Sequence, residues 1–185
     1  MKLLLHSCCA PCSTGCLAGL EEEGIKPVLF WYNPNIHPWT EYRSRRDCLE
    51  NFAQGKNLDL VKIDEYGLRL FLRETNTAEA GGMAGEDPKT GRCNCCYRLR
   101  LEKTAECARQ GAYDCFSTTL LISPYQRHED IKKTGEELAV RYGVAFFYRD
   151  FRPFFRAGQT DARKRGLYMQ KYCGCIFSEE ERYRS

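Results

Sequence analysis

Short apolar runs alternate with helical patterns along nearly the whole chain, and this alternation constrains the fold more than any other feature. A strand, a helix and a second strand form a right-handed crossover unit, and repeated units give a parallel sheet with helices on both faces. The apolar runs lie at Leu3–Leu5, Val28–Tyr32, Leu58–Ile63, Cys115–Leu121 and Val144–Tyr148. The helical patterns lie at Thr14–Glu23, Trp39–Gln54, Cys96–Gln110 and Arg127–Tyr142.

Length and composition bound the domain organisation. A chain of 185 residues, 43% hydrophobic and 29% charged, suits one globular domain with a sizeable core. No apolar stretch approaches the length of a membrane span, and the run Leu3–Leu5 is too short for a signal peptide, so we expect a cytoplasmic protein without a membrane partner. We predict one α/β domain over residues 1–185, with a mobile, glycine-rich loop at about 75–92 and a basic, helical C-terminal portion at about 151–185.

Twelve cysteines are present, and three of them stand close together directly after the first apolar run. In a chain of this class such abundance favours metal or redox chemistry over a disulfide scaffold. The stretch His6–Ser13 is typical of the turn between a strand and a helix, at the sheet edge where open α/β folds place their chemistry. Free N–H groups at a helix start stabilise thiolates. We therefore expect a cofactor or redox role for Cys8 and Cys9, whereas Cys16 fits a packing residue better.

A second group of cysteines follows the glycine-rich loop. Cys93 and Cys96 have the Cys-x-x-Cys spacing that places two sulfurs on one side of a turn or helix start, which suits iron–sulfur clusters and zinc. Together with Cys8 and Cys9 they complete a set of four thiolates. Cys95 competes for such a site, although it would have to splay away from its neighbour to share one.

Other cysteines and the loop after the second apolar run are less specific. Cys48 and Cys107 fall within expected helices and Cys115 within an expected strand, so we interpret all three as packing residues. The loop after the second run contains His37 and Glu41. These two side chains either reach a metal or substrate, or brace the loop.

Basic and aromatic side chains are interleaved from Phe151 to Lys171. Basic groups neutralise phosphates and aromatic faces stack on bases, so the mixture suits a nucleic-acid surface. A solvated helix with its aromatic residues turned into the core is the alternative. The candidate contacts are Arg152, Arg156, Arg163, Lys164 and Arg165.

Cys173 and Cys175 are separated by a single glycine, which relaxes the backbone and lets the two thiols approach closely. A disulfide across so small a ring would be strained and therefore easily reduced. We predict a redox couple or a metal claw here, with two unrelated buried thiols as the alternative.

Five motifs in order resemble the QueH-type epoxyqueuosine reductases, nearly from end to end of the chain. They are His6–Ser13, Tyr32–Pro38, Arg92–Leu101, Ser117–Tyr125 and Tyr172–Ser178. The resemblance implies a Rossmann-like sheet of the adenine-nucleotide α-hydrolase (HUP) type. The run Cys-Cys-Ala-Pro-Cys stands where ATP-using relatives carry a glycine-rich loop, so we expect no ATP, and no flavin or NAD fingerprint is visible.

The resemblance also implies a cofactor and a reaction. It implies a second, mononuclear iron next to a [4Fe–4S] cluster, and a redox-active pair formed by Cys173 and Cys175. The implied cluster ligands are Cys8, Cys9, Cys93 and Cys96. The implied substrate is tRNA that carries epoxyqueuosine at the wobble position, and an external low-potential donor supplies two electrons that remove the epoxide oxygen to leave queuosine.

Further roles follow from this interpretation. Cys12 is the spare thiol best placed for the second metal, with Cys173 or Cys175 next, and Tyr97, Tyr172 or a bound water is expected to protonate the departing oxygen. The rival hypothesis is a non-catalytic, zinc-stabilised module that binds tRNA or a protein; it would be colourless, whereas a [4Fe–4S] protein is brown. An ATP-dependent tRNA thiolase would share the fold but should carry the glycine-rich loop.

Overall fold

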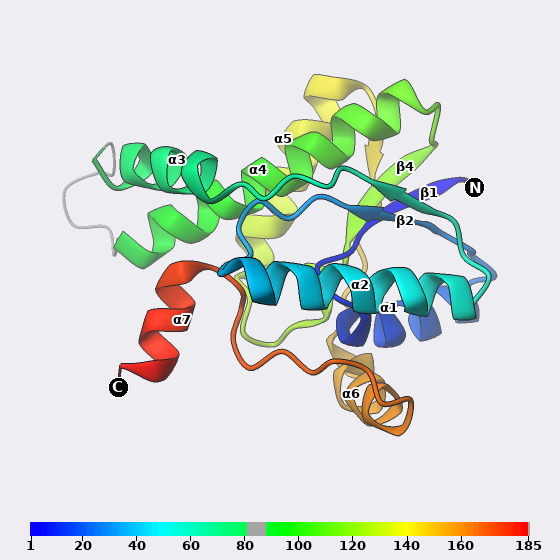
Figure 1. Ribbon diagram of the computed structural model, residues 1–185. Helices are drawn as coiled ribbons and strands as arrows, with labels where there is room; N and C mark the ends of the chain where they lie inside the picture. Colours follow the sequence, from blue (N-terminus) through cyan, green and yellow to red (C-terminus); the bar gives the residue numbers. More distant parts are fainter. Residues whose placement is uncertain (81–87, 185) are drawn as a thin grey trace.

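A parallel sheet forms the centre of the molecule, as seen in a computed structural model that describes residues 1–80 and 88–184 (Figure 1). Its strand order is β3-β2-β1-β4-β5, with every neighbouring pair parallel. This is the order of Rossmann-like α/β folds, so the predicted fold class is confirmed. The strands are β1 (Leu3–His6), β2 (Val28–Trp31), β3 (Leu60–Lys62), β4 (Cys115–Thr118) and β5 (Ala145–Phe146).

Helices cover both faces of the sheet (Figure 1). On one side lie α1 (Ala10–Glu22), α2 (Trp39–Gly55) and α6 (Phe155–Lys164); on the other lie α3 (Leu68–Ala80), α4 (Pro88–Gln110) and α5 (His128–Tyr142). The last helix is α7 (Ile176–Tyr183), and short 3₁₀ turns η1 and η2 span Thr119–Ile122 and Arg152–Phe154. Among the described residues, no helix combines the length and the apolar character needed to cross a membrane.

The central strand β1 sets the position of the site. All its residues are fully buried, because a central parallel strand is covered on both faces. At its carboxyl end, the His6 ring contacts Thr118 through Nδ1 at 2.9 Å and Asn33 through Nε2 at 3.2 Å. These contacts tie the ends of β1, β2 and β4 together at one edge of the sheet.

Several boundaries differ from the sequence prediction. Helix α1 begins at Ala10 rather than Thr14, because Cys9 takes an extended conformation and a proline, which is favoured in the first turn of a helix, follows it. The second half of the run predicted as a strand at Cys115–Leu121 forms η1. The helix α3 was not predicted.

The predicted mobile loop at about 75–92 is wrong at both of its ends. Residues 75–80 belong to α3, and residues 88–92 form the start of α4. The part of the predicted loop at 81–87 lies outside the described residues. The C-terminal portion is helical in η2, α6 and α7, but residues 165–175 form an irregular segment between the last two helices.

Helices α1 and α6 pack closely against each other, and each has a glycine at the contact. A β-carbon on Gly158 would lie 2.9 Å from the Cα of Gly15, and one on Gly15 would lie 2.4 Å from a methyl group of Ile122. The hydroxyl of Thr14 also donates to the carbonyl of Gly158 at 2.9 Å. The helix at the start of the basic C-terminal portion is thereby fixed against the helix that follows the cysteine turn.

Candidate active site

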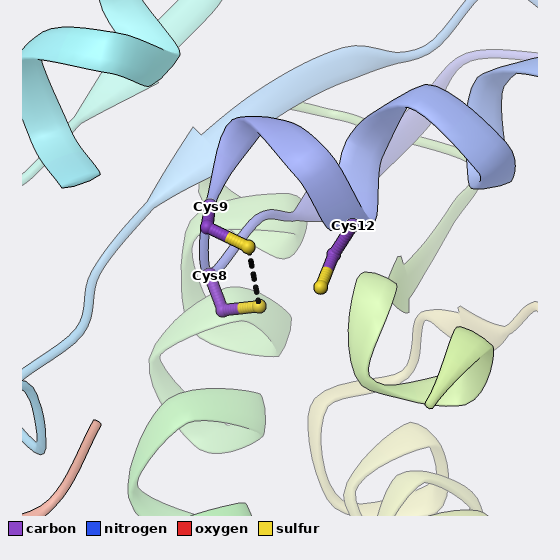
Figure 2. Close-up of side chains that lie close together, drawn as sticks. All are labelled: Cys8, Cys9 and Cys12. Carbon is purple, nitrogen blue, oxygen red and sulfur yellow. Dashed lines mark hydrogen bonds between the residues drawn. The ribbon is translucent and has the colours of Figure 1, made fainter. Parts of the chain in front are cut away.

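Three thiols gather at the start of α1. The sulfur atoms of Cys8, Cys9 and Cys12 lie within 4.8 Å of one another, and the Sγ atoms of the first two are 3.7 Å apart (Figure 2). All three side chains are buried. The extended backbone at Cys9 turns the first two sulfurs toward Cys12, which follows one helical turn later.

The three thiols differ in their electrostatics. Hydrogen bonds from Cys12, Cys9 and the hydroxyl of Thr119 hold the pKa of Cys8 well below its usual range. The pKa of Cys12 is raised because its proton is donated to Cys8, and burial raises the pKa of Cys9. Hydrogen bonding within the group thus moves the pKa of Cys8 and that of Cys12 in opposite directions. Soft sulfur donors in this number suit iron–sulfur clusters or zinc.

Cys93 and Cys96 lie on α4, on the same face as Arg100. The guanidinium Nη2 of Arg100 lies 3.1 Å from the Cys96 sulfur, and both side chains are buried. The charges that act on Cys93 and Cys96 include those of Cys173 and Cys175, so the C-terminal cysteine segment lies near the α4 sulfurs. Neither joins the group of sulfurs that lie within 4.8 Å of one another in the described residues.

Cys95 faces a different environment from its two neighbours. Burial, and after it the negative charge of Glu74 on α3, raises the pKa of Cys95 to about 11. Its electrostatic neighbours are Glu74 and Arg98, and the other cysteines are not among them. The helical geometry of α4 thus separates Cys95 from the face that carries Cys93 and Cys96.

Cys173 and Cys175 make different contacts. The sulfur of Cys173 accepts a hydrogen bond from the amide of Gln126 at 3.6 Å. The sulfur of Cys175 accepts from the backbone N–H of Ser178 at 3.4 Å and so caps α7. All cysteines of the chain lie within the described residues, and each is a free thiol.

A buried arginine holds the segment that carries Cys173. Arg45 on α2 donates to the carbonyls of Tyr172 and Cys173, each at 2.9 Å, and its Nε forms an ion pair with Glu41 at 2.7 Å. The N–H of His37 donates to the carbonyl of Gly174 at 2.8 Å. The loop residues singled out from the sequence thus brace the Cys173 segment through Glu41 and the backbone of His37.

A cavity of about 720 Å³ opens onto these thiols. Its wall includes the sulfur-bearing residues Cys8, Cys12 and Cys173, the basic residues Arg156, Arg163 and Lys171, and the aromatic residues Tyr125, Phe155 and Tyr172. Thiols, cations and aromatic rings from distant parts of the sequence therefore face one space.

The predicted basic contacts divide into two sets. Arg156 and Arg163 line the cavity, whereas Arg152, Lys164 and Arg165 do not. Arg152 pairs with Asp150 and Arg165 with Asp161, at 2.6 and 2.7 Å.

Sequence reasoning did not single out Arg45, Arg100 or Gln126. The spacing of Arg45 from Glu41, and of Arg100 from Cys96, is four residues in both cases, which places each pair on one helix face. That signal alone does not separate a buried arginine from the many exposed ones.

Comparison with known proteins gives consistent matches over almost the whole chain. A family model described as "Epoxyqueuosine reductase QueH" matches residues 3–181. A protein of that description from Dehalococcoides mccartyi is 36% identical over 182 residues, covering 98% of this chain and 94% of its own. Another from Thermotoga maritima is 35% identical over 182 residues, covering 97% and 91%.

A solved structure shares the fold. A crystal structure described as a predicted subunit of tRNA methyltransferase from Methanocaldococcus jannaschii superimposes with a TM-score of 0.53. It covers 100% of this chain and 93% of its own, at 13% sequence identity. At that identity the likeness supports the α/β architecture alone.

Proposed function

Because the chain belongs to the QueH family of epoxyqueuosine reductases, we propose that it converts epoxyqueuosine in tRNA to queuosine within the cavity beside the α1 thiols. The reaction takes two electrons and two protons. Both C–O bonds of the epoxide break, a carbon–carbon double bond forms, and the oxygen leaves as water. An external low-potential donor supplies the electrons.

One observation carries this proposal: thiols, cations and aromatic rings all line the same cavity. Thiolates bind metals that transfer electrons. Cations neutralise phosphates, and aromatic rings stack on bases splayed out of a loop. The combination suits a redox reaction on a nucleotide that is held within a polynucleotide.

The donor set fits an iron–sulfur cluster. Within the described residues, the side chains that gather as candidate ligands are the buried cysteines Cys8, Cys9 and Cys12, and Cys96 is buried as well; soft sulfur donors of this kind suit an iron–sulfur centre. We propose Cys8, Cys9, Cys93 and Cys96 as the cluster ligands and Cys12 as a ligand of a second iron. When bound, such a centre supplies single electrons at a potential set by burial and hydrogen bonds.

Residues around the cavity have separate tasks in this scheme. Tyr172 lines the wall, and burial, with Glu41 adding to the effect, raises the pKa of its hydroxyl, so it keeps a proton to donate at neutral pH. The hydroxyls of both tyrosines make hydrogen bonds, that of Tyr172 to the carbonyl of His37 at 2.5 Å and that of Tyr97 to Gln126 at 3.0 Å. Tyr97 is buried and does not line the cavity, so of the two tyrosines predicted from the sequence we propose Tyr172 as the proton donor.

Binding of tRNA is assigned to the cavity rim. We propose that Arg156, Arg163 and Lys171 contact phosphates of the anticodon loop. The rings of Tyr125 and Phe155, whose centroids are 6.2 Å apart, offer a surface on which an unstacked base can rest. A base taken out of its stack in this way can reach a recessed site.

The test compares the same protein loaded anaerobically with iron and sulfide or with zinc alone. Each form is incubated with tRNA that carries epoxyqueuosine and with dithionite, and the nucleosides are measured by mass spectrometry. We expect queuosine only with the brown, iron-loaded protein. Unchanged epoxyqueuosine in the presence of a fully loaded cluster would contradict the proposal, and equal activity of the zinc form would contradict its redox chemistry.

A further inference from the structure

Arg100 is a buried cation without an acidic partner. Its side chain is 1% exposed, and a guanidinium stays protonated in proteins. Within the described parts of the chain, no carboxylate lies at ion-pairing distance from it; its hydrogen bonds go to the carbonyl and the sulfur of Cys96, each at 3.1 Å. An uncompensated buried charge is strongly unfavourable, so a negative group is required nearby.

The Cys96 sulfur, 3.1 Å from Arg100, can supply this negative charge, because cysteine binds a metal as a thiolate. The groups that act on the charge of Arg100 are Cys96, Cys173, Cys8 and the hydroxyl of Tyr97. The other buried arginine of the site is different, because Arg45 has Glu41 at 2.7 Å. Arg45 thus has a carboxylate partner as well as the nearby Cys9, whereas the contact of the Arg100 guanidinium is to the sulfur of Cys96.

We propose that Arg100 is the counter-charge of the anionic iron–sulfur centre and a hydrogen-bond donor to its ligand Cys96, and that it raises the reduction potential of that centre. This inference rests on the proposed function. Reduction adds one negative charge, which a fixed cation in a buried site stabilises more than it stabilises the oxidised form. A hydrogen bond to a ligand sulfur acts in the same direction.

The test replaces Arg100 with Met, which keeps much of the apolar stem, and with Lys, which keeps the charge. Arg98→Gln is the matched control, because Arg98 lies on the same helix but is exposed and pairs with Glu137 at 2.7 Å. The midpoint potential of the loaded protein is measured by anaerobic titration followed in the visible spectrum. We expect Arg100→Met to shift the one-electron equilibrium about tenfold toward the oxidised form, about 59 mV, and Lys to restore part of the shift.

A second measurement separates this role from a structural one. Among the described residues, the Arg100 side chain makes hydrogen bonds only within its own helix turn, so Arg100→Met should not lower the Tm of the metal-free protein. Loss of iron from that variant with an unchanged metal-free Tm, and recovery with Lys, would support the counter-charge. A lowered metal-free Tm, or an unchanged potential in a loaded variant, would overturn it. Absence of any cluster from the unsubstituted protein would instead refute the proposed cofactor.

Discussion

The guanidinium of Arg45 donates from Nη1 to the backbone carbonyl of Cys173, at 2.9 Å. The contact joins α2 to a segment 128 residues further along the chain and holds it over the cysteines of α1. Gly174 permits this approach: its φ is +131°, and a β-carbon there would lie 3.1 Å from the same Nη1 atom. The position of the Cys173 sulfur thus depends on one buried arginine and one glycine.

Replacement of Gly174 by Ala should therefore reduce turnover while the iron content stays normal. The new side chain forces the segment away from Arg45 and adds about 1–3 kcal/mol of backbone strain. Gly166→Ala is the matched control, since that glycine also has a positive φ, +65°, but nothing lies within 4 Å of its β-carbon position. Rates measured at saturating tRNA should fall for the first variant only; equal rates would show that the segment's placement is unimportant.

The cluster ligands can be tested by iron and sulfide analysis. Substitution of Cys8, Cys9, Cys93 or Cys96 by Ala should remove or degrade the cluster, because each iron of a cluster needs its own thiolate. Cys48→Ala and Cys107→Ala should retain it. A full complement of iron in Cys93→Ala would refute that assignment, and a loss in Cys95→Ala would be unexpected because Cys95 faces Glu74 instead.

Charge reversal on α6 should weaken tRNA binding more when the residue lines the cavity than when it does not. Arg163→Glu removes a cation from the cavity wall, so its affinity for an anticodon stem-loop should fall roughly tenfold and the salt slope should drop by about one. Lys164→Glu changes the charge equally on a residue outside the wall and should have a smaller effect. Titrations at several salt concentrations measure both; equal losses would show that only the net charge of the helix matters.

The contact between α1 and α6 gives a prediction about stability. Gly158→Ala places a β-carbon 2.9 Å from Gly15 and should cost about 1–3 kcal/mol of unfolding free energy through overpacking. Gly55 is the last residue of α2, and nothing lies within 4 Å of its β-carbon position. Gly55→Ala should therefore leave the unfolding free energy unchanged or raise it by about 0.5–1 kcal/mol. Denaturant unfolding of the metal-free proteins compares the two. Equal unfolding free energies for the two variants would mean that α1 and α6 can move apart without loss of stability.

Much of this fold can be predicted from the sequence because it depends on local patterns. The apolar runs at Leu3–Leu5 and Val28–Tyr32 become β1 and β2 within a residue or so, and the parallel pairing of the strands follows from the alternation of strand and helix. The start of α4 was placed at Cys96 because glycines precede it, yet the helix begins at Pro88, where a proline is well tolerated. Where a helix starts therefore depends on how glycines that disfavour it and a proline that is tolerated in its first turn act together, and no single residue shows the outcome.

The candidate site could be predicted only in part. Clustering of thiols along the sequence indicates Cys8 and Cys9 directly, since adjacent residues at a helix start share one location. The roles of Arg45 and Arg100 arise from tertiary burial, which no local pattern records. Arg163 lines the cavity and Lys164 does not. This difference likewise depends on tertiary packing, because the contact of Gly158 with α1 determines which face of α6 is turned toward the cavity.

Cys173 and Cys175 make different contacts, so the effects of replacing each one can be compared. Cys175→Ser keeps a side chain able to cap α7, so the fold should survive. If Cys173 and Cys175 relay electrons together, both Ser variants should lose turnover and keep their iron. If only Cys173→Ser is impaired, the sulfur at the cavity wall acts alone and the paired role is refuted.

The most direct measurement is the amount of queuosine formed per protein in one anaerobic turnover on epoxyqueuosine tRNA. Unsubstituted protein, Cys173→Ser and Cys48→Ser are compared at equal iron content; Cys48 is half-buried on α2 and lies outside the cavity wall. We predict full conversion by the unsubstituted protein and Cys48→Ser, and a loss of at least about tenfold in Cys173→Ser. No queuosine from the iron-loaded unsubstituted protein, or equal conversion by all three, would contradict a reductase whose chemistry takes place in this cavity.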